Sequence, residues 1–551
     1  MNLLTGTISW DLPRTGVSIQ DYVFTDGRLK LEVTRFKNQK HDKRNYHYNP
    51  ATEILITLLG QITNLKEIKR QYLITLDSDM EIVENLYNIK GASFIEELDG
   101  TFLISVSDRQ KSKCYVFQSW AGYSLPIYYV SRNNCFYFST SLRALLDALP
   151  FSPELDVAGV RDFLHYGLMI PNHLTMIKEV SKLVCGNYLA IDLESRSFDI
   201  LSYNPNRMRV SAAVAENRLV DSIGWCVRSL AEQLEDNFVT LTLTGGWDTN
   251  LILHYFQQCN KAPLRAVTVN GGGAVTDEVA MAKNTLAYYK DIEHFATAVT
   301  EDTILSLPDI VSRCEGYPFD EGIFLRYELG QLLQRVGCES VFMGVGADQI
   351  LFPETTFKKA LRLIRNKIVN YRKGLWRPGR GCSLANRYDI YIDYNLKMHG
   401  IMLNSFGIEG YYPFLNLTTS AMSQALGFKR SFRKKLYKQQ VAKTLDPRIV
   451  ENIKKSSAVS DPSPFFIKNR NLFLEIVRSS FAAGILNGGD IDKLLSDSNR
   501  QYLLICQLAY VFLFNEIFIK GKSVPETKEV FCKKKISSIA SKAENQIMIE
   551  N

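Results

Sequence analysis

Two segments about a hundred residues apart share one arrangement, in which an apolar run meets glycines and then an aspartate. Residues 241–249 read Leu-Thr-Leu-Thr-Gly-Gly-Trp-Asp-Thr, and residues 341–348 read Val-Phe-Met-Gly-Val-Gly-Ala-Asp. Each has the form of a buried strand, a tight turn and the start of a helix. In a doubly wound parallel sheet the carboxyl ends of neighbouring strands face one crevice. The two segments therefore predict such a sheet, with Asp248 and Asp348 at one edge of it.

The first segment has the residue types of a phosphate-binding loop. Its glycines let the backbone turn tightly and approach an anion, and the start of the following helix attracts negative charge. Asp248 would repel a phosphate unless a cation lay between them, which predicts an Mg²⁺ ligand. For one segment alone, a strand-to-helix turn without a ligand is the simpler alternative. The candidate nucleotide contacts are Leu243, Thr244, Gly245, Gly246, Asp248 and Thr249.

The second segment weakens that alternative. Gly344 and Gly346 would extend the nucleotide site, and Asp348 would share one Mg²⁺ with Asp248. The competing interpretation is that Asp348 only caps the helix that follows. Two matched units favour a shared metal over two unrelated turns.

The pattern of apolar residues changes near residue 206. Before it, short β-rich runs alternate with turn residues, which predicts an α+β region of antiparallel sheets. After it, strands alternate with helices, which predicts an α/β region that becomes mostly helical from residue 357. We expect three parts, at 1–205, 206–525 and a basic tail at 526–551. The strands expected in the first part lie at 71–76, 101–107, 113–118, 127–130, 135–139 and 188–193, with a helix at 141–149.

Composition excludes several classes of protein. The 551 residues exceed what one hydrophobic core holds. The sequence shows no run of about 18 apolar residues, so a membrane-spanning helix is not expected. Its first residues carry no basic leader, so a secretory signal is not expected either. The ten cysteines are scattered without a Cys-x-x-Cys pair, so a cytoplasmic location is expected and a zinc site is not. The net charge of +7 is mild for this length and gives no reason to expect a nucleic-acid partner.

Basic residues do gather at 358–380 and 430–438. The plain interpretation is a solvated helix face and a loop. The sharper alternative is a docking surface for an acidic or polyanionic partner.

Several segments resemble the class B asparagine synthetase family. Residues 244–249 are similar to its pyrophosphate loop, Ser-Gly-Gly-x-Asp-Ser, with threonine at both serine positions, and 344–348 are similar to its Gly-Glu-Gly-Ala-Asp element. The resemblance extends over nearly the whole chain in order. Its other segments are 98–102, 122–129 and 138–145 in the glutaminase-like half, and 276–280, 407–416 and 435–455 in the synthetase half.

The resemblance implies both a fold and a chemistry. It implies an N-terminal Ntn-hydrolase-like, glutaminase-type sandwich and a C-terminal sheet of the adenine-nucleotide α-hydrolase, or ATP-pyrophosphatase, type. It also implies that ATP binds at 244–249, that Mg²⁺ bridges Asp248 and Asp348, and that an acyl-adenylate forms. Lys455 falls where the family has a catalytic lysine, and a cation there would stabilise charge developing on the α-phosphate. Lys454 is the alternative if the alignment shifts by one, and a surface lysine is the plain alternative for both.

Two positions depart from the family. Its glutaminase nucleophile is a cysteine directly after the initiator methionine, whereas this chain has Asn2, whose amide cannot act as a thiolate. Glutamine hydrolysis is therefore not expected, and nothing in the sequence supports processing that would expose Thr5 or Ser9 instead. Val345 replaces a glutamate and can neither move a proton nor hold an amine. Asp393 is the candidate carboxylate to take over that role.

The favoured function is an ATP-dependent amide ligase that adenylates a small-molecule or peptide carboxylate and joins it to an amine or ammonia. The alternatives are a lasso-peptide or β-lactam-type cyclase of natural-product biosynthesis, amidation of a surface-glycan sugar, and a pseudoenzyme scaffold. A tRNA-modifying ATP-pyrophosphatase would share the Gly-Gly-x-Asp loop but leaves the first 205 residues unexplained. A precursor peptide or partner protein fits the cyclase, and the oligomeric state stays open, with a homodimer as one option.

Overall fold

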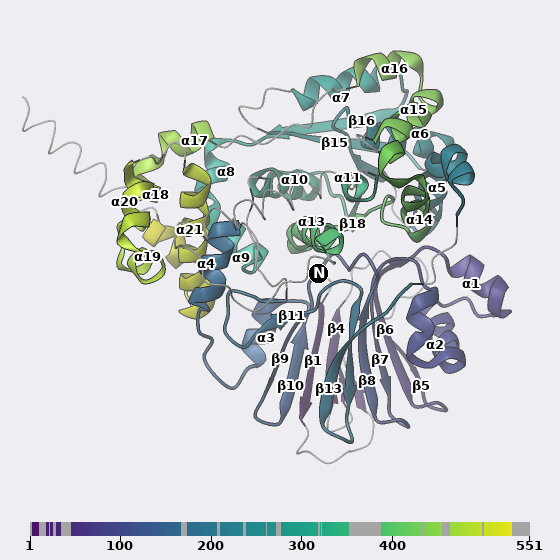
Figure 1. Cartoon of the computed structure of the whole chain (residues 1–551), viewed down its shortest axis with the longest axis horizontal. Helices are drawn as coiled ribbons and strands as arrows, with labels where there is room; N and C mark the ends of the chain where they lie inside the picture. The colour runs from purple at the N-terminus through teal and green to yellow at the C-terminus, as the bar shows by residue number, and fades with distance from the viewer. Residues whose placement is uncertain are drawn as a thin grey trace, which may run out of the picture.

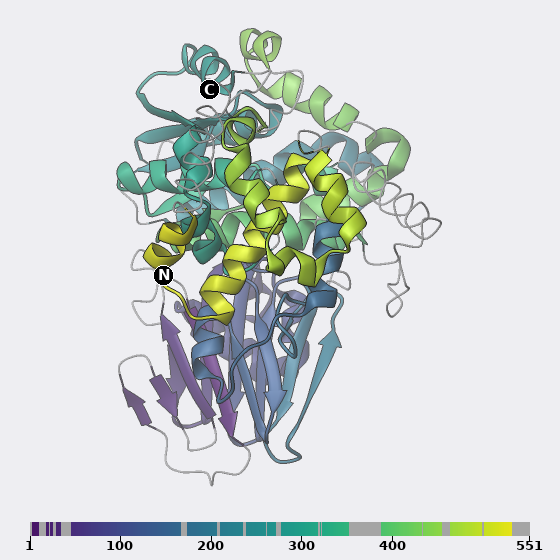
Figure 2. The same cartoon turned by 90° about the vertical axis from the view of Figure 1, so that its left-hand side faces the viewer.

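Two antiparallel sheets form the lower part of the molecule, and a parallel sheet lies above them (Figures 1 and 2). The computed structural model describes residues 3–9, 18–20, 23–25, 29–34, 46–166, 173–205, 210–234, 238–259, 262–271, 277–317, 320, 322–351, 387–431, 434–453, 463–496, 498 and 501–531. We call the antiparallel part the N-terminal sandwich and the part from residue 210 onward the parallel-sheet region.

The first sheet of the N-terminal sandwich has the strand order β11-β9-β10-β1-β4-β3-β2. In β1 (Leu3–Ser9) burial alternates from residue to residue, as a strand with one face on the core requires. The strands beside it are β10 (Cys135–Ser139) and β4 (Leu29–Thr34), both antiparallel to it. The remaining strands are β2 (Ser18–Gln20), β3 (Val23–Thr25), β9 (Tyr128–Arg132) and β11 (Ser181–Lys182).

The second sheet has the order β13-β12-β8-β7-β6-β5 and is buried on both faces in its middle. Every residue of β6 (Ile54–Ile62) is buried. Leu55 and Leu59 enter the core between the sheets, whereas Ile56 and Leu58 face α2 (Asp79–Lys90). The other strands are β5 (Tyr46–Asn49), β7 (Gly100–Asp108), β8 (Lys113–Gln118), β12 (Asn187–Asp192) and β13 (Ser197–Ser202), and the short helices are η1 (Gly91–Glu97), α3 (Leu142–Ala148) and α4 (Val157–Tyr166).

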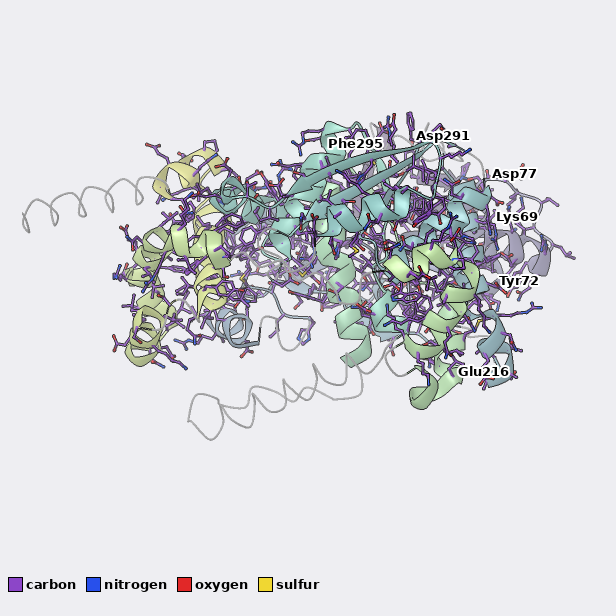
Figure 3. The ribbon with its side chains drawn as sticks, turned by 90° about the horizontal axis from the view of Figure 1, so that it is seen from above. Lys69, Tyr72, Asp77, Glu216, Asp291 and Phe295 are labelled. Atoms are coloured by element: carbon purple, nitrogen blue, oxygen red, sulfur yellow. The ribbon has the colours of Figure 1, made fainter. Side chains whose placement is uncertain are left out.

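The expected doubly wound parallel sheet is present, with the order β16-β15-β14-β17-β18 and only parallel pairs. The chain runs from β14 through β15 to β16 on one side and then crosses back to β17 on the other side of β14. The strand order therefore reverses at β14, the usual place for a ligand crevice. The strands are β14 (Val239–Thr242), β15 (Leu264–Asn270), β16 (Ile292–Ala298), β17 (Ser340–Phe342) and β18 (Glu409–Tyr411). Phe295 marks the edge strand β16 at the margin of the molecule (Figure 3).

Helices surround this sheet and continue to the end of the described chain. Those before β18 are α5 (Ala212–Glu232), α6 (Trp247–Cys259), α7 (Glu278–Leu286), α8 (Glu301–Leu305), α9 (Leu307–Cys314), α10 (Ile323–Arg335), α11 (Ala347–Leu351) and α13 (Arg387–Ser405). Those after it are α14 (Leu417–Ser431), α15 (Lys435–Thr444), α16 (Pro447–Asn452), α17 (Ser463–Lys468), α18 (Arg470–Val477), α19 (Ser480–Ile485), α20 (Gly488–Ser496), α21 (Tyr502–Phe514) and the π-helical η4 (Asn515–Ile519). Contrary to the expectation from sequence, Tyr502–Ile519 is an 18-residue helix that is apolar and long enough for a membrane span. In this structure 78% of it is buried inside the protein.

One predicted strand is wrong. Residues 71–76 were expected to be β, but α1 (Leu65–Tyr72) runs into this segment and stops at Leu73, whose φ of 56° is left-handed. Ile68 is the buried residue of α1. A short helix with so little buried surface leaves a weak periodic signal, so the β-rich composition at its end was misleading.

The N-terminal sandwich and the parallel-sheet region are joined by buried hydrogen bonds across their seam. The Asp99 carboxylate accepts from the backbone N–H of Leu417 at 2.9 and 3.0 Å and from Trp120 Nε1 at 3.3 Å. Gln61 Nε2 donates to Glu409 Oε1 at 2.7 Å. Because buried polar groups that lose a partner cost free energy, each part of the seam stabilises the other.

Asp99 is expected to make the stability of this seam depend on pH. It is 4% exposed, and burial raises its pKa from 3.8 to about 6 against the opposing effect of its N–H donors. Between these values the folded state binds more protons than the unfolded state, so the contribution of Asp99 falls as the pH rises from about 4 to about 6, by about 3 kcal/mol. Urea unfolding should therefore show wild type losing stability relative to Asp99→Asn between pH 4 and pH 7. A difference that is constant with pH would contradict this.

Candidate functional site

The turn after β14 can be made only with glycine at one position. Gly245 has a φ of 67°, and a Cβ there would lie 2.6 Å from Met281 Cβ on α7. The Thr249 hydroxyl accepts from the backbone N–H of Thr244 at 3.3 Å and lies 3.3 Å from the Thr244 hydroxyl. Both threonines thus belong to one compact turn at the start of α6, with Gly246 between them in the chain.

Leu243 is the most enclosed of the predicted nucleotide contacts. Its side chain is fully buried, its N–H donates to Val267 O at 2.9 Å, and its carbonyl accepts from Thr268 Oγ1 at 2.6 Å. Its role as a nucleotide contact stays a prediction.

The turn after β17 lies directly against the first one. A Cβ on Gly344 would lie 3.4 Å from Asp248 Cβ. Gly346 has a φ of 90°, and a Cβ there would be 2.3 Å from Leu415 Cδ2. The two glycine turns therefore meet at one edge of the sheet, as the sequence predicts.

A lysine joins the two predicted metal ligands. Lys434 Nζ lies 2.8 Å from Asp248 Oδ2 and 2.8 Å from Asp348 Oδ1. The lysine side chain is 7% exposed, against 25% for Asp248 and 63% for Asp348. The structure thus brings both aspartates together around one buried cation. We call Asp248, Asp348 and Lys434 the ion cluster.

The electrostatics of the ion cluster keep Lys434 charged. Burial alone would lower the pKa of its ammonium, but attraction to Asp248 and Asp348 outweighs burial and raises it. Tyr437 lies three residues further on, and the Lys434 ammonium is 5.6 Å from the centre of its ring. Burial and the nearby charge of Asp248 hold the pKa of the Tyr437 phenol well above its usual range, so it stays protonated.

The ion cluster fits a magnesium site that is completed by the oxygens of a bound phosphate. Mg²⁺ is commonly held by one or two carboxylates together with substrate phosphates, rather than by a cage of protein ligands. The position between Asp248 and Asp348 already stabilises a positive charge. Within the described ranges of the chain there is no group of three or more His, Cys, Asp or Glu side chains that could hold a metal without such help.

Other predicted site residues fall outside what the structure describes. Lys454, Lys455 and Asn2 lie outside the described residues, and so does the basic segment 352–386 that contains 358–380. Asp393 lies on α13, but its side chain is not among those described. The catalytic roles of Lys455 and Asp393 therefore stay predictions.

Val345 is partly buried and packs against the hydrophobic core. Asp277, from the segment that resembles Ser-Asp-Glu, accepts from the backbone N–H groups of Val279 and Ala280 and caps α7. Its contribution is thus to fix the helix whose Met281 packs on Gly245.

Lys434 is the site residue that sequence analysis missed. The basic run 430–438 was interpreted as a solvated face or a docking surface, which is wrong for this buried lysine. The sequence did contain a hint that Lys434 is buried. Tyr437 lies within the basic run, three residues after Lys434, a spacing that puts the two on one helix face. Its two carboxylate partners, however, are 186 and 86 residues away in the chain, which only the fold reveals.

Comparisons with known proteins match two family descriptions to this chain. Residues 33–203 match the glutamine amidotransferase domain, and residues 226–380 match asparagine synthase. A glutamine-hydrolyzing asparagine synthetase 2 of Bacillus subtilis is 25% identical over 43% of this chain and 34% of its own length. A glutamine-hydrolyzing asparagine synthetase of Sandersonia aurantiaca is 23% identical over 57% of this chain and 56% of its own length. The chain thus spans about a third of the length of the first relative and just over half of the length of the second.

Among solved structures, the U34-tRNA thiolase NcsA of Methanococcus maripaludis is similar over 55% of this chain and 82% of its own, at 15% identity and a TM-score of 0.25. A similarity this low carries no argument, and the fold rests on the sheets themselves.

Lys434→Met is expected to destabilise the protein in a way that Mg²⁺ repairs. Without the ammonium, two carboxylates face each other, which should cost about 1–3 kcal/mol because both are partly exposed. A divalent cation between them would replace the lost charge. Thermal unfolding should therefore show a larger stabilisation by millimolar Mg²⁺ in Lys434→Met than in wild type.

The exposed neighbour Lys435 supplies the matched control for this measurement. Lys435→Met should behave as wild type with and without Mg²⁺. Equal effects of the two substitutions would show that the ion cluster does not form a cation site.

Proposed function

Because this chain belongs to the asparagine synthetase family, we propose that it is an ATP-dependent amide ligase. It adenylates a carboxylate, releases pyrophosphate and transfers the acyl group from AMP to an amine or ammonia. The observation that carries the proposal is the ion cluster at the edge of the parallel sheet, directly beside the 244–249 turn. A scaffold that only kept the fold would have no need for two glycine turns converging on paired carboxylates.

The reaction follows from what the residues of the site can do. Phosphate oxygens of ATP would be held by the backbone N–H groups of the 244–249 turn and by the start of α6, where the helix dipole favours negative charge. The substrate carboxylate oxygen attacks the α-phosphorus, and pyrophosphate leaves. The amine then attacks the acyl carbon, loses a proton, and AMP leaves with the former carboxylate oxygen. Asp248 and Asp348 would hold a magnesium ion, which when bound neutralises charge on the phosphates.

Lys434 has a second part in this proposal. Its charge remains in the site during adenylation, when negative charge builds up between the α-phosphorus and the departing pyrophosphate. A buried cation contributes more to such stabilisation than an exposed one, because it is poorly screened. Lys455, at the position that resembles the family's catalytic lysine, follows all three cluster residues in the chain and would supply a further positive charge.

We further propose that the N-terminal sandwich does not hydrolyse glutamine. Asn2 stands in place of the family's nucleophile. Of the described cysteines in the sandwich, Cys114 and Cys185 are buried and Cys135 is partly buried. The Thr5 hydroxyl is hydrogen-bonded to Ser139 Oγ at 2.8 Å within the sheet. The amine would then come as free ammonia or as part of a larger substrate.

The substrate class has several candidates. Val345 stands where the family has a glutamate and can neither move a proton nor hold a charged amine, which favours an amine other than the family's usual one. A lasso-peptide or β-lactam-type cyclase in natural-product biosynthesis and amidation of a surface-glycan sugar are the candidates. A precursor-peptide gene beside this one would support the first, and a glycan cluster the last. The eight described cysteines are all free, which supports a reducing, cytoplasmic location.

Pyrophosphate release is the test of this function. With Mg²⁺, ATP, an amine and the correct carboxylate, purified protein should release pyrophosphate and not orthophosphate. Asp248→Asn and Asp348→Asn should each lower kcat by about 10²–10³ through weakened metal binding. Asp302→Asn, at an exposed aspartate of α8, is the control for a lost surface charge. Wild-type turnover in both Asn variants would contradict the shared-metal assignment.

Glutamate release tests the second proposal. Protein incubated with glutamine, with and without ATP, should give no glutamate above background, because an asparagine cannot form the thioester that cysteine forms. Hydrolysis that follows the protein through purification would show that another nucleophile exists.

A further inference from the structure

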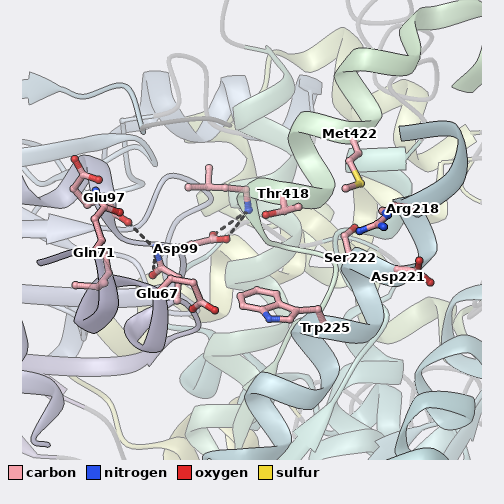
Figure 4. Close-up of a pocket in the computed structure, with 13 residues that line it drawn as sticks. Glu67, Gln71, Glu97, Asp99, Arg218, Asp221, Ser222, Trp225, Thr418 and Met422 are labelled. Carbon is pink, nitrogen blue, oxygen red and sulfur yellow. Dashed lines mark hydrogen bonds between the residues drawn. The ribbon is translucent and has the colours of Figure 1, made fainter. Parts of the chain in front are cut away.

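A cavity of about 570 Å³ lies in the seam between the N-terminal sandwich and the parallel-sheet region. Its walls come from α1 and η1 on one side and from α5 and the start of α14 on the other (Figure 4). Viewed from above, Tyr72 of α1 and Glu216 of α5 lie at the same end of the molecule (Figure 3). Cavities of roughly 300–1,000 Å³ are the usual size for small-molecule sites. The proposed ligation chemistry does not use this one.

Three charged side chains of the cavity are left without partners. Glu67 on α1, and Arg218 and Asp221 on α5, line it and are exposed to solvent. They make no hydrogen bond or ion pair with any residue that the structure describes. Arg218 and Asp221 are three residues apart on one helix, a spacing at which they would be able to pair. The other carboxylates of the cavity are already engaged, since Glu97 pairs with Lys90 and Asp99 with Leu417.

An apolar surface separates the charges. In Figure 4 Glu67 lies on one side of the Trp225 ring, and Arg218 and Asp221 lie on the other. Ile68 and Met422, both buried, also line the cavity. A tryptophan face attracts cations as well as apolar groups. The cavity therefore offers a carboxylate at one end, an aromatic wall in the middle, and an arginine with an aspartate at the other end.

We propose that this cavity binds a free amino acid with a positively charged side chain. Arg218 binds its α-carboxylate, Asp221 its α-ammonium, the aliphatic part of the side chain lies on Trp225, and Glu67 binds the terminal cation. The charges match: the three unpaired groups sum to −1, from two carboxylates and one guanidinium, and such an amino acid carries +1. Arg218 supplies the planar, bidentate geometry that carboxylates favour.

A ligand in this position would connect the two parts of the molecule. Glu67 belongs to the N-terminal sandwich and Asp221 to the parallel-sheet region, so an amino acid held by both strengthens the seam. The floor of the cavity includes Asp99 and Leu417, which bond to each other. Leu417 follows Leu415, which packs on Gly346 beside Asp348. Binding here therefore acts on the same chain segment that shapes the ion cluster.

Calorimetric titration of the full chain with L-arginine tests the inference without reference to any ligase activity. L-citrulline, which has the same length but a neutral side chain, and agmatine, which lacks the carboxylate, are the comparison ligands. Wild type should bind L-arginine saturably and L-citrulline at least tenfold more weakly. Glu67→Gln should lose the preference for L-arginine over L-citrulline, and Arg218→Gln should lose the preference for L-arginine over agmatine.

Glu194→Gln, at an exposed carboxylate on the turn between β12 and β13, is the control and should bind as wild type. Far-ultraviolet circular dichroism confirms that each variant is folded. The inference would be overturned if wild type showed no saturable binding of L-arginine up to roughly 10 mM. That limit corresponds to a binding free energy weaker than about 3 kcal/mol. So would a preference for L-arginine over L-citrulline that survives in Glu67→Gln.

Discussion

The site depends on one buried charge, the Lys434 ammonium between Asp248 and Asp348. Three segments that are far apart in the chain must meet for this to occur, and two carboxylates that close together need a cation to offset their repulsion. The parallel strand order brings the aspartates to one edge of the sheet. The glycines at 245 and 346 permit the turns that aim them, and the lysine lies at the N-cap of α15.

The N-terminal sandwich is tied to this site through its buried polar residues. Asp99 accepts a hydrogen bond from the N–H of Leu417, and Gln61 donates one to Glu409. Glu409 and Leu417 lie on either side of Leu415, the residue that packs on Gly346. Removing the sandwich would take these partners from the Leu417 N–H and the Glu409 carboxylate. The sandwich thus has a physical role apart from any glutaminase chemistry, because it bonds to the chain segment that follows β18.

The sequence predicted the elements whose pattern is local. The strand at 113–118 and the strand at 135–139 match β8 and β10 residue for residue, because alternation and turn residues mark both ends. The meeting of Asp248 with Asp348 was also predictable, since parallel-sheet topology fixes it. The helix at 65–72 could not be predicted, because it has little buried surface. The role of Lys434 could not be predicted either, because it depends on contacts across the fold.

The fate of the carboxylate oxygen distinguishes activation as an acyl-adenylate from other routes to an amide. A carboxylate that supports pyrophosphate release would be labelled with ¹⁸O and turned over with ATP, Mg²⁺ and the amine, and the products analysed by mass spectrometry. Attack of the carboxylate on the α-phosphorus predicts one labelled oxygen in AMP and none in pyrophosphate. Labelled orthophosphate formed together with ADP, or AMP without label, would rule out an acyl-adenylate.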